Sequence, residues 1–130
     1  MTKPAPETSD FPRPTGGLRV LVCGGRDYAD RATFDRWMAP LRTRAVSIIT
    51  GCASGADTLA LGWAQTWGIH LDFYPADWKK HGKAAGPIRN RQMLEMGRPD
   101  LVIAFPGGRG TADMIRQAEA AGVEVRKVTS

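Results

Sequence analysis

Short apolar runs alternate with amphipathic stretches along most of this chain. Five of the runs are rich in Val, Ile, Leu or Phe and have the length of buried strands: 18–23, 46–50, 69–74, 101–105 and 123–128. Between them, apolar side chains recur at helical spacing, as at Phe34, Met38 and Leu41. Strands that alternate with helices over short connections predict an α/β fold. We expect a Rossmann-like three-layer structure with a parallel sheet of about five strands.

Residues with known helix-end preferences mark where the helices begin and stop. Asp30 has the position of an N-cap, Ser54 and Asp57 have the S-x-x-D spacing of a capping box, and Gly68 follows a helical pattern directly. The polar and basic segment 76–85 is expected to be a loop. The helices are therefore predicted at about 30–41, 54–67, 87–96 and 111–121.

The first 17 residues differ in composition from the rest. They are rich in Pro, Ser, Thr and Gly and lack periodicity, so we expect a disordered tail at 1–17 and one domain at 18–130. No apolar run is long enough to span a membrane, and the start lacks the apolar core of a signal peptide. We therefore expect a cytoplasmic protein with no membrane partner.

The charge of the chain points to an anionic partner. The formal net charge is +5, and 79–91 carries five basic residues and no acid. The two Cys and two His match no metal-ligand spacing, so we expect neither a metal nor another cofactor. A nucleotide or a nucleic acid would suit such a basic domain.

Three glycine-rich turns follow predicted strands, at 24–25, 51–55 and 107–110. The carboxyl ends of parallel strands share one edge of the sheet, where ligands of this fold bind. Each of the last two turns leads into a helix, whose first N–H groups lack helical partners and attract anions. None of the turns matches G-x-G-x-x-G or G-x-x-x-x-G-K-[ST], which disfavours an ordinary NAD site and a P-loop ATPase. The turns therefore predict a different kind of phosphate site.

Candidate ligand-binding residues come from these turns and from the helix start near residue 89. Arg89 lies where its charge opposes the helix dipole, so a bound phosphate would account for it. Simpler roles as turns, caps or solvated charges remain open for each residue, and Trp78 could stack on a base. The candidates are Gly24, Gly25, Arg26, Gly51, Ser54, Gly55, Arg89, Asn90, Pro106, Gly107, Gly108, Gly110 and Thr111.

Four motifs in this order resemble the YspA, cpYpsA-related branch of the SLOG superfamily. They are G-G-R-D-Y at 24–28, T-G-x-x-x-G-A-D at 50–57, G-P-x-R-N-x-x-M at 86–93 and F-P-G-G-x-G-T at 105–111. The resemblance covers about residues 18–128. It implies a Rossmannoid fold that binds nucleotides or nucleotide-derived ligands, in many members as an inferred sensor. It also implies a homo-oligomer, because a neighbouring chain often completes such sites.

The chain departs from the motif of related hydrolases at one position that matters for catalysis. The Lonely Guy phosphoribohydrolases, relatives in the superfamily, have a motif similar to P-G-G-x-G-T-x-x-E, whose Glu acts on the ribose. Here that position is Met114, and Asp113 lies one residue earlier, about 100° around the helix. Three carboxylates remain as candidate catalytic groups: Asp113, Asp57 and Asp27.

Three functions fit these observations. We favour a nucleotide-binding sensor or adaptor domain, because the phosphate-binding set is intact while the Glu is missing. An N-glycoside hydrolase acting on nucleoside 5′-monophosphates is the first alternative. The second is a nucleic-acid-binding module like DprA, another relative, supported by the charge and by the basic stretch 79–91.

Overall fold

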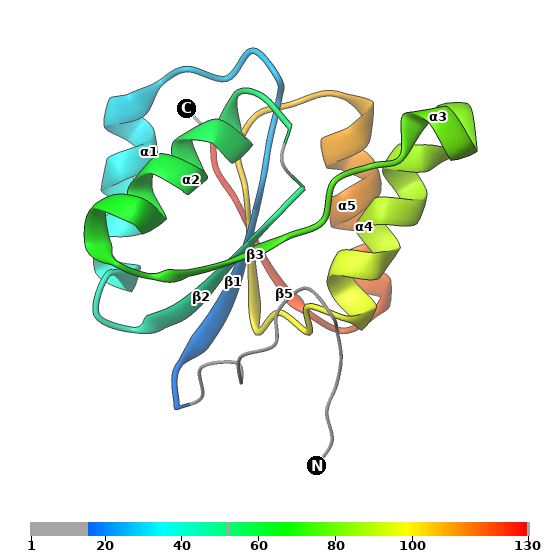
Figure 1. The fold of residues 1–130 in the computed structure, drawn as a ribbon. Helices are drawn as coiled ribbons and strands as arrows, with labels where there is room; N and C mark the ends of the chain where they lie inside the picture. The colour runs from blue at the N-terminus through cyan, green and yellow to red at the C-terminus, as the bar shows by residue number, and fades with distance from the viewer. Residues whose placement is uncertain (1–15, 52, 130) are drawn as a thin grey trace.

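The computed structural model describes residues 16–51 and 53–129, and within these ranges a sheet of five parallel strands forms the centre of the protein (Figure 1). Its order is β3-β2-β1-β4-β5. The strands are β1 (Leu18–Cys23), β2 (Ala45–Thr50), β3 (His70–Phe73), β4 (Leu101–Ala104) and β5 (Glu124–Lys127). The expected α/β fold with a parallel five-stranded sheet is therefore confirmed.

Helices cover both faces of this sheet (Figure 1). On one face lie α1 (Arg31–Met38) and α2 (Ala56–Trp67), and on the other lie α4 (Ala85–Glu95) and α5 (Arg109–Ala120). The chain builds the sheet outward from β1 to β3 and then returns to place β4 on the other side of β1. The strand order reverses there, which opens a crevice at the carboxyl ends of β1 and β4.

Side chains of β1 alternate between two cores. Val20 and Val22 pack with α1 and α2, while Leu21 packs with Met93 of α4 and Met114 of α5. All these side chains are at most 2% exposed. Because both faces of the strand are buried, its sequence is a continuous apolar run rather than an alternating one.

The helix ends partly follow the predicted signals. Asp30 caps α1, since its carboxylate accepts a hydrogen bond from the Thr33 N–H at 3.1 Å. The predicted capping box is wrong: α2 begins after Gly55, with no side-chain cap, and Ser54 is exposed. The Asp57 carboxylate instead accepts from the Ala53 N–H at 3.0 Å, because the left-handed Gly55 (φ 71°) redirects the chain at the helix start.

The segment predicted as a loop is helical. It contains α3 (Trp78–His81) and a 3-10 turn (Gly82–Ala84), and α4 then begins at Ala85 rather than at 87. The Asp77 carboxylate caps α3 by accepting from the Lys80 N–H at 3.1 Å. This short helix buries none of its residues, so it has no apolar periodicity that the sequence could reveal.

Other boundaries shift by one to three residues. A 3-10 turn (Ala39–Leu41) completes α1, and α5 begins at Arg109 instead of 111. Residues 1–15 of the expected tail lie outside the described residues, so the division at residue 17 stays a prediction. No helix in the described part of the chain has both the length and the apolarity needed to cross a bilayer.

Replacing Gly55 with Ala should destabilise the fold by about 2 kcal/mol or more, because the residue has a left-handed backbone. A Cβ there would also lie 2.1 Å from the carbonyl oxygen of Gly25. Gly62→Ala is the matched control, since a Cβ at this helical position meets nothing within 4 Å and should stabilise by about 0.5–1 kcal/mol. Urea unfolding measures both, and equal stabilities would contradict the prediction.

Candidate functional site

Three glycine turns meet at the backbone of Gly25. Its N–H donates to the Pro106 carbonyl oxygen at 2.9 Å, which ties the turn after β1 to the turn after β4. Its own carbonyl oxygen accepts from the Ala56 N–H at 3.2 Å, which ties the same turn to the start of α2. The expectation that these turns share one edge therefore holds in the structure, and hydrogen bonds connect them.

The packing around the turns leaves little room for a side chain at several of the glycines. A Cβ on Gly55 would overlap the Gly25 carbonyl, and a Cβ on Gly107 would lie 2.2 Å from Thr111 Oγ1. At Gly51 a Cβ would lie 2.2 Å from Nη1 of Arg89. The Arg89 guanidinium thus lies directly on the backbone at the end of β2.

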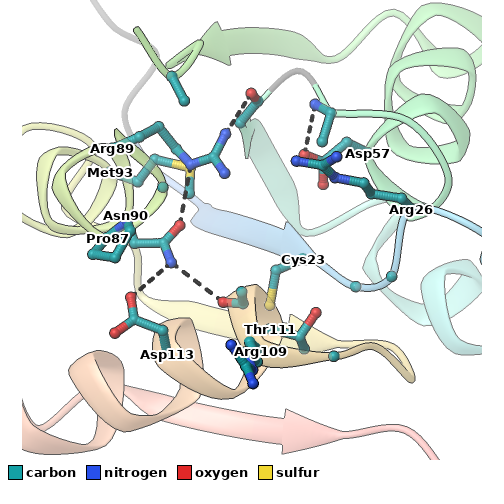
Figure 2. A pocket seen from close by; sticks show the side chains of 18 of the residues that line it. Cys23, Arg26, Asp57, Pro87, Arg89, Asn90, Met93, Arg109, Thr111 and Asp113 are labelled. Carbon is teal, nitrogen blue, oxygen red and sulfur yellow. Dashed lines mark hydrogen bonds between the residues drawn. The ribbon is translucent and has the colours of Figure 1, made fainter. Parts of the chain in front are cut away.

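A cavity of about 930 Å³ opens at this edge (Figure 2). It is within the range of small-molecule and cofactor pockets. Most of the candidate residues line it: Gly24, Gly25, Arg26, Gly51, Ser54, Asp57, Arg89, Asn90, Gly108, Gly110, Thr111 and Asp113. Gly55, Pro106 and Gly107 are not among the lining residues. Asp27 is exposed and lies outside the lining as well.

The cavity also has lining residues that the sequence analysis did not select. Arg109, the first residue of α5, and Lys83 add two cations, and Cys23 lies at the end of β1. Trp78 of α3, which the sequence did suggest as a surface for base stacking, also forms part of the wall. Arg109 lies within the P-G-G-x-G-T motif, so the motif could have identified it as a site residue. Lys83 was considered only as one charge of the basic stretch 79–91.

A chain of hydrogen bonds runs across the wall from α5 to the end of β2 (Figure 2). Nδ2 of Asn90 donates to Asp113 Oδ2 at 2.9 Å and to the Gly110 carbonyl at 3.3 Å. Oδ1 of Asn90 accepts from Nε of Arg89 at 3.1 Å. Nη1 of Arg89 donates to the Gly51 carbonyl at 2.7 Å. Residues from three elements are therefore fixed relative to one another.

Comparisons with known proteins identify the family of this chain and one relative. A family model described as the YspA, cpYpsA-related SLOG family matches residues 18–81. The Gene 61 protein of Mycobacterium phage D29 is 38% identical over 119 residues, which cover 82% of this chain and 93% of the phage protein.

The chain belongs to the YspA, cpYpsA-related SLOG family.

Membership confirms the resemblance found in the four motifs, and it supports a nucleotide-related role at the level of the family. The name of the phage protein assigns no activity. The family model ends at residue 81, so it does not reach Arg89 or the glycine turn after β4. The roles of those residues therefore depend on the geometry of this chain.

Asp113 of this SLOG protein is held as an anion. Burial alone would raise its pKa, but hydrogen bonds from Asn90 and Gln117 and the ion pair with Arg116 outweigh that effect and lower the pKa below its ordinary value of 3.8. An acid with a lowered pKa is a poor proton donor near neutral pH. Met114, at the position of the hydrolases' Glu, is fully buried against the sheet and does not line the cavity.

The pKa of Asp57, in contrast, is raised above its ordinary value. Burial raises its pKa, and neither the hydrogen bond from the Ala53 N–H nor the charge of Arg89 fully offsets this. Cys23 lies nearby, and burial, followed by the Asp57 carboxylate, raises the pKa of its thiol to about 12. The thiol is therefore protonated at neutral pH and is not a nucleophile. Across the described residues, no group of three His, Cys, Asp or Glu side chains is arranged to hold a metal ion.

Asp113→Asn should lower the free energy of unfolding at pH 7 by about 1–3 kcal/mol, because one end of a buried hydrogen-bond network loses an acceptor. A carboxylate with a lowered pKa stabilises the fold above its ordinary pKa, and this contribution is lost as the pH falls through the lowered value. The difference between variant and wild type should therefore shrink in acid.

Urea unfolding at several pH values tests this prediction. Asp35→Asn is a control at an exposed ion pair, where the change should be within about 0.5 kcal/mol. A difference for Asp113→Asn that does not shrink as the pH is lowered into acid would show that the charge of Asp113 contributes little.

Proposed function

We propose that this protein binds a nucleotide or nucleotide-derived ligand through its phosphate, as a sensor or adaptor domain. The observation that carries the proposal is the start of α5, which opens into a cavity rich in basic side chains. Four cations line this cavity against two carboxylates within the described residues: Arg26, Lys83, Arg89 and Arg109 against Asp57 and Asp113. Such a cavity attracts a small anion.

The proposed phosphate subsite lies between α5 and Arg89. The N-cap of α5 is Gly108, and no side chain caps the helix. A Cβ on Gly108 or Gly110 would meet nothing within 4 Å, and both residues line the cavity. The absence of side chains there leaves room for an anion to approach the N–H groups of the first turn, as helix starts favour. Arg89 and the Thr111 hydroxyl supply further donors.

The proposed base subsite lies on the wall formed by α3. Trp78 is 48% exposed, although it lines the cavity, and its indole offers a flat surface for stacking. The guanidinium of Arg26 lies 5.7 Å from the ring centroid of Trp78, so one wall combines an aromatic face with a cation. A nucleotide has both the base and the phosphate that these two subsites would recognise.

Binding without reaction is favoured because both carboxylates in the cavity already have protein partners. Asp113 accepts hydrogen bonds from Asn90, Gln117 and Arg116. Asp57 accepts from the Ala53 N–H. A general base must be free to take a proton from water or from a substrate, and here each carboxylate is engaged by the fold.

A hydrolase acting on nucleoside 5′-monophosphates is the second candidate. The observation that favours it is Asp57, a buried carboxyl with a raised pKa in the wall of a cavity. Groups of this kind often serve in proton transfer. Asp113 and Asp27 stay predicted alternatives, with Asp27 exposed outside the lining.

A screen of the purified protein with AMP, other nucleoside monophosphates, NAD and ADP-ribose, followed by mass spectrometry, tests the choice between binding and hydrolysis. We expect retained, unaltered nucleotide. Release of free base that is lost in Asp57→Asn would establish the hydrolase instead. If neither binding nor product is found, the proposed nucleotide function is wrong for these ligands.

Gly110→Ala should weaken the binding of AMP about tenfold or more, which corresponds to about 1.4 kcal/mol, because the methyl group would occupy the space that the phosphate needs. The fold should keep its stability, since the added Cβ meets no protein atom within 4 Å. Gly62→Ala is the control, because it adds the same group to a helix away from the cavity. Unchanged affinity in calorimetry would remove the α5 start from the site.

The nucleic-acid module and the homo-oligomer stay predictions. Lys79 and Lys80 are exposed outside the cavity, whereas Lys83 and Arg89 line it. Part of the basic stretch 79–91 therefore lies in the cavity wall rather than on an open surface. Contacts with many phosphates would make binding fall steeply with salt, and a mononucleotide pocket would respond far less.

A further inference from the structure

Asn90 connects the two parts of the proposed phosphate subsite. Its side chain, 3% exposed, lies between the first turn of α5 and the guanidinium of Arg89. The amide donates toward Asp113 and the Gly110 carbonyl and accepts from Arg89 (Figure 2). An amide has one donor end and one acceptor end, so the direction in which it points decides which neighbour it can satisfy.

Asp113 sets the direction of this amide together with the Gly110 carbonyl and the Nε–H of Arg89. An ionised carboxylate only accepts hydrogen bonds, and the lowered pKa keeps Asp113 ionised. The NH₂ end of Asn90 must therefore face Asp113, which leaves Oδ1 facing Nε of Arg89. A reversed amide would place an NH₂ group against the Nε–H of Arg89, donor against donor, and a carbonyl against the carboxylate.

The position of Arg89 depends in turn on this acceptor. The guanidinium is a rigid planar fork, so fixing Nε on Asn90 and Nη1 on the Gly51 carbonyl fixes its plane in the cavity wall. The absent side chain of Gly51 leaves the room that the guanidinium fills. Without Asn90 Oδ1, one of these two anchors is lost.

We infer that Asp113 is a positioning residue, which orients the amide of Asn90 and through it holds Arg89 in place for the ligand phosphate. The inference rests on the proposed function for its binding effect, although the positioning itself can be measured without a ligand. It assigns to Asp113 a role other than proton transfer. The carboxylate acts through two side chains and does not touch the ligand.

The binding test compares AMP with adenosine, which lacks the phosphate, by calorimetry at neutral pH. Asp113→Asn should weaken AMP binding about tenfold, because the change removes a carboxylate oxygen that accepts from Asn90 and so loosens the amide that holds Arg89. Adenosine binding should stay unchanged. A variant that binds both compounds more weakly by the same factor would show general damage to the pocket, and unchanged AMP binding would overturn the inference.

A double-mutant cycle with Arg89→Ala tests the proposed order of action. If Asp113 acts through Arg89, the double variant should bind AMP no more weakly than Arg89→Ala alone. Fully additive losses would show that Asp113 acts independently, which contradicts the inference. Arg116→Ala is the matched control: Arg116 is largely exposed and contacts the same carboxylate but not Asn90, and the hydrogen bonds from Asn90 and Gln117 still lower the pKa of Asp113. AMP affinity should survive this change.

A nuclear magnetic resonance measurement of arginine Nε–H groups reports the positioning in the free protein. The signal that disappears in Arg89→Ala is that of Arg89, and it should exchange slowly with water in the wild type and rapidly in Asp113→Asn. If the exchange is unchanged, the inference fails even where the wild type binds AMP. If the exchange changes as expected but the wild type binds neither compound, the positioning stands and the proposed nucleotide function fails.

Discussion

The backbone of Gly25 is the point on which the sheet edge that carries the cavity depends. One peptide N–H and one carbonyl oxygen, on the same residue, connect the turn after β1 to the other two turns. Side chains on Gly55 or Gly107 would push those turns away. Because backbone groups hold the three turns, the cavity has a fixed floor on which Arg89, Asn90 and the start of α5 can be arranged.

The sequence predicted the features that depend on local pattern. Buried apolar runs located the strands, and the Asp30 cap was correct because a single side chain reaches the backbone three residues on. Glycines that follow the predicted strands located the turns, and most of the candidate ligand residues do line one cavity. The parts that could be predicted are thus those set by spacing along the chain.

The rest could not be predicted because it depends on contacts between distant segments. Gly51 looked like a turn residue, yet its missing side chain makes room for Arg89, 38 positions away. Asp113 looked like a displaced catalytic acid, and only the position of Asn90 on another helix shows how it is engaged. Helix α3 was not predicted because it buries none of its residues, so its sequence has no apolar residues at helical spacing.

The exposure of α3 and the 3-10 turn after it affects how easily the ligand preference of such a pocket can change between related proteins. Trp78 and Lys83 form a wall of the cavity, yet α3 and the 3-10 turn after it bury none of their residues. Substitutions there change the lining without opening a hole in either hydrophobic core, so they need no compensating change elsewhere. Related chains can therefore acquire different ligand preferences on an unchanged scaffold, with the turns of the proposed phosphate subsite retained and only this wall substituted.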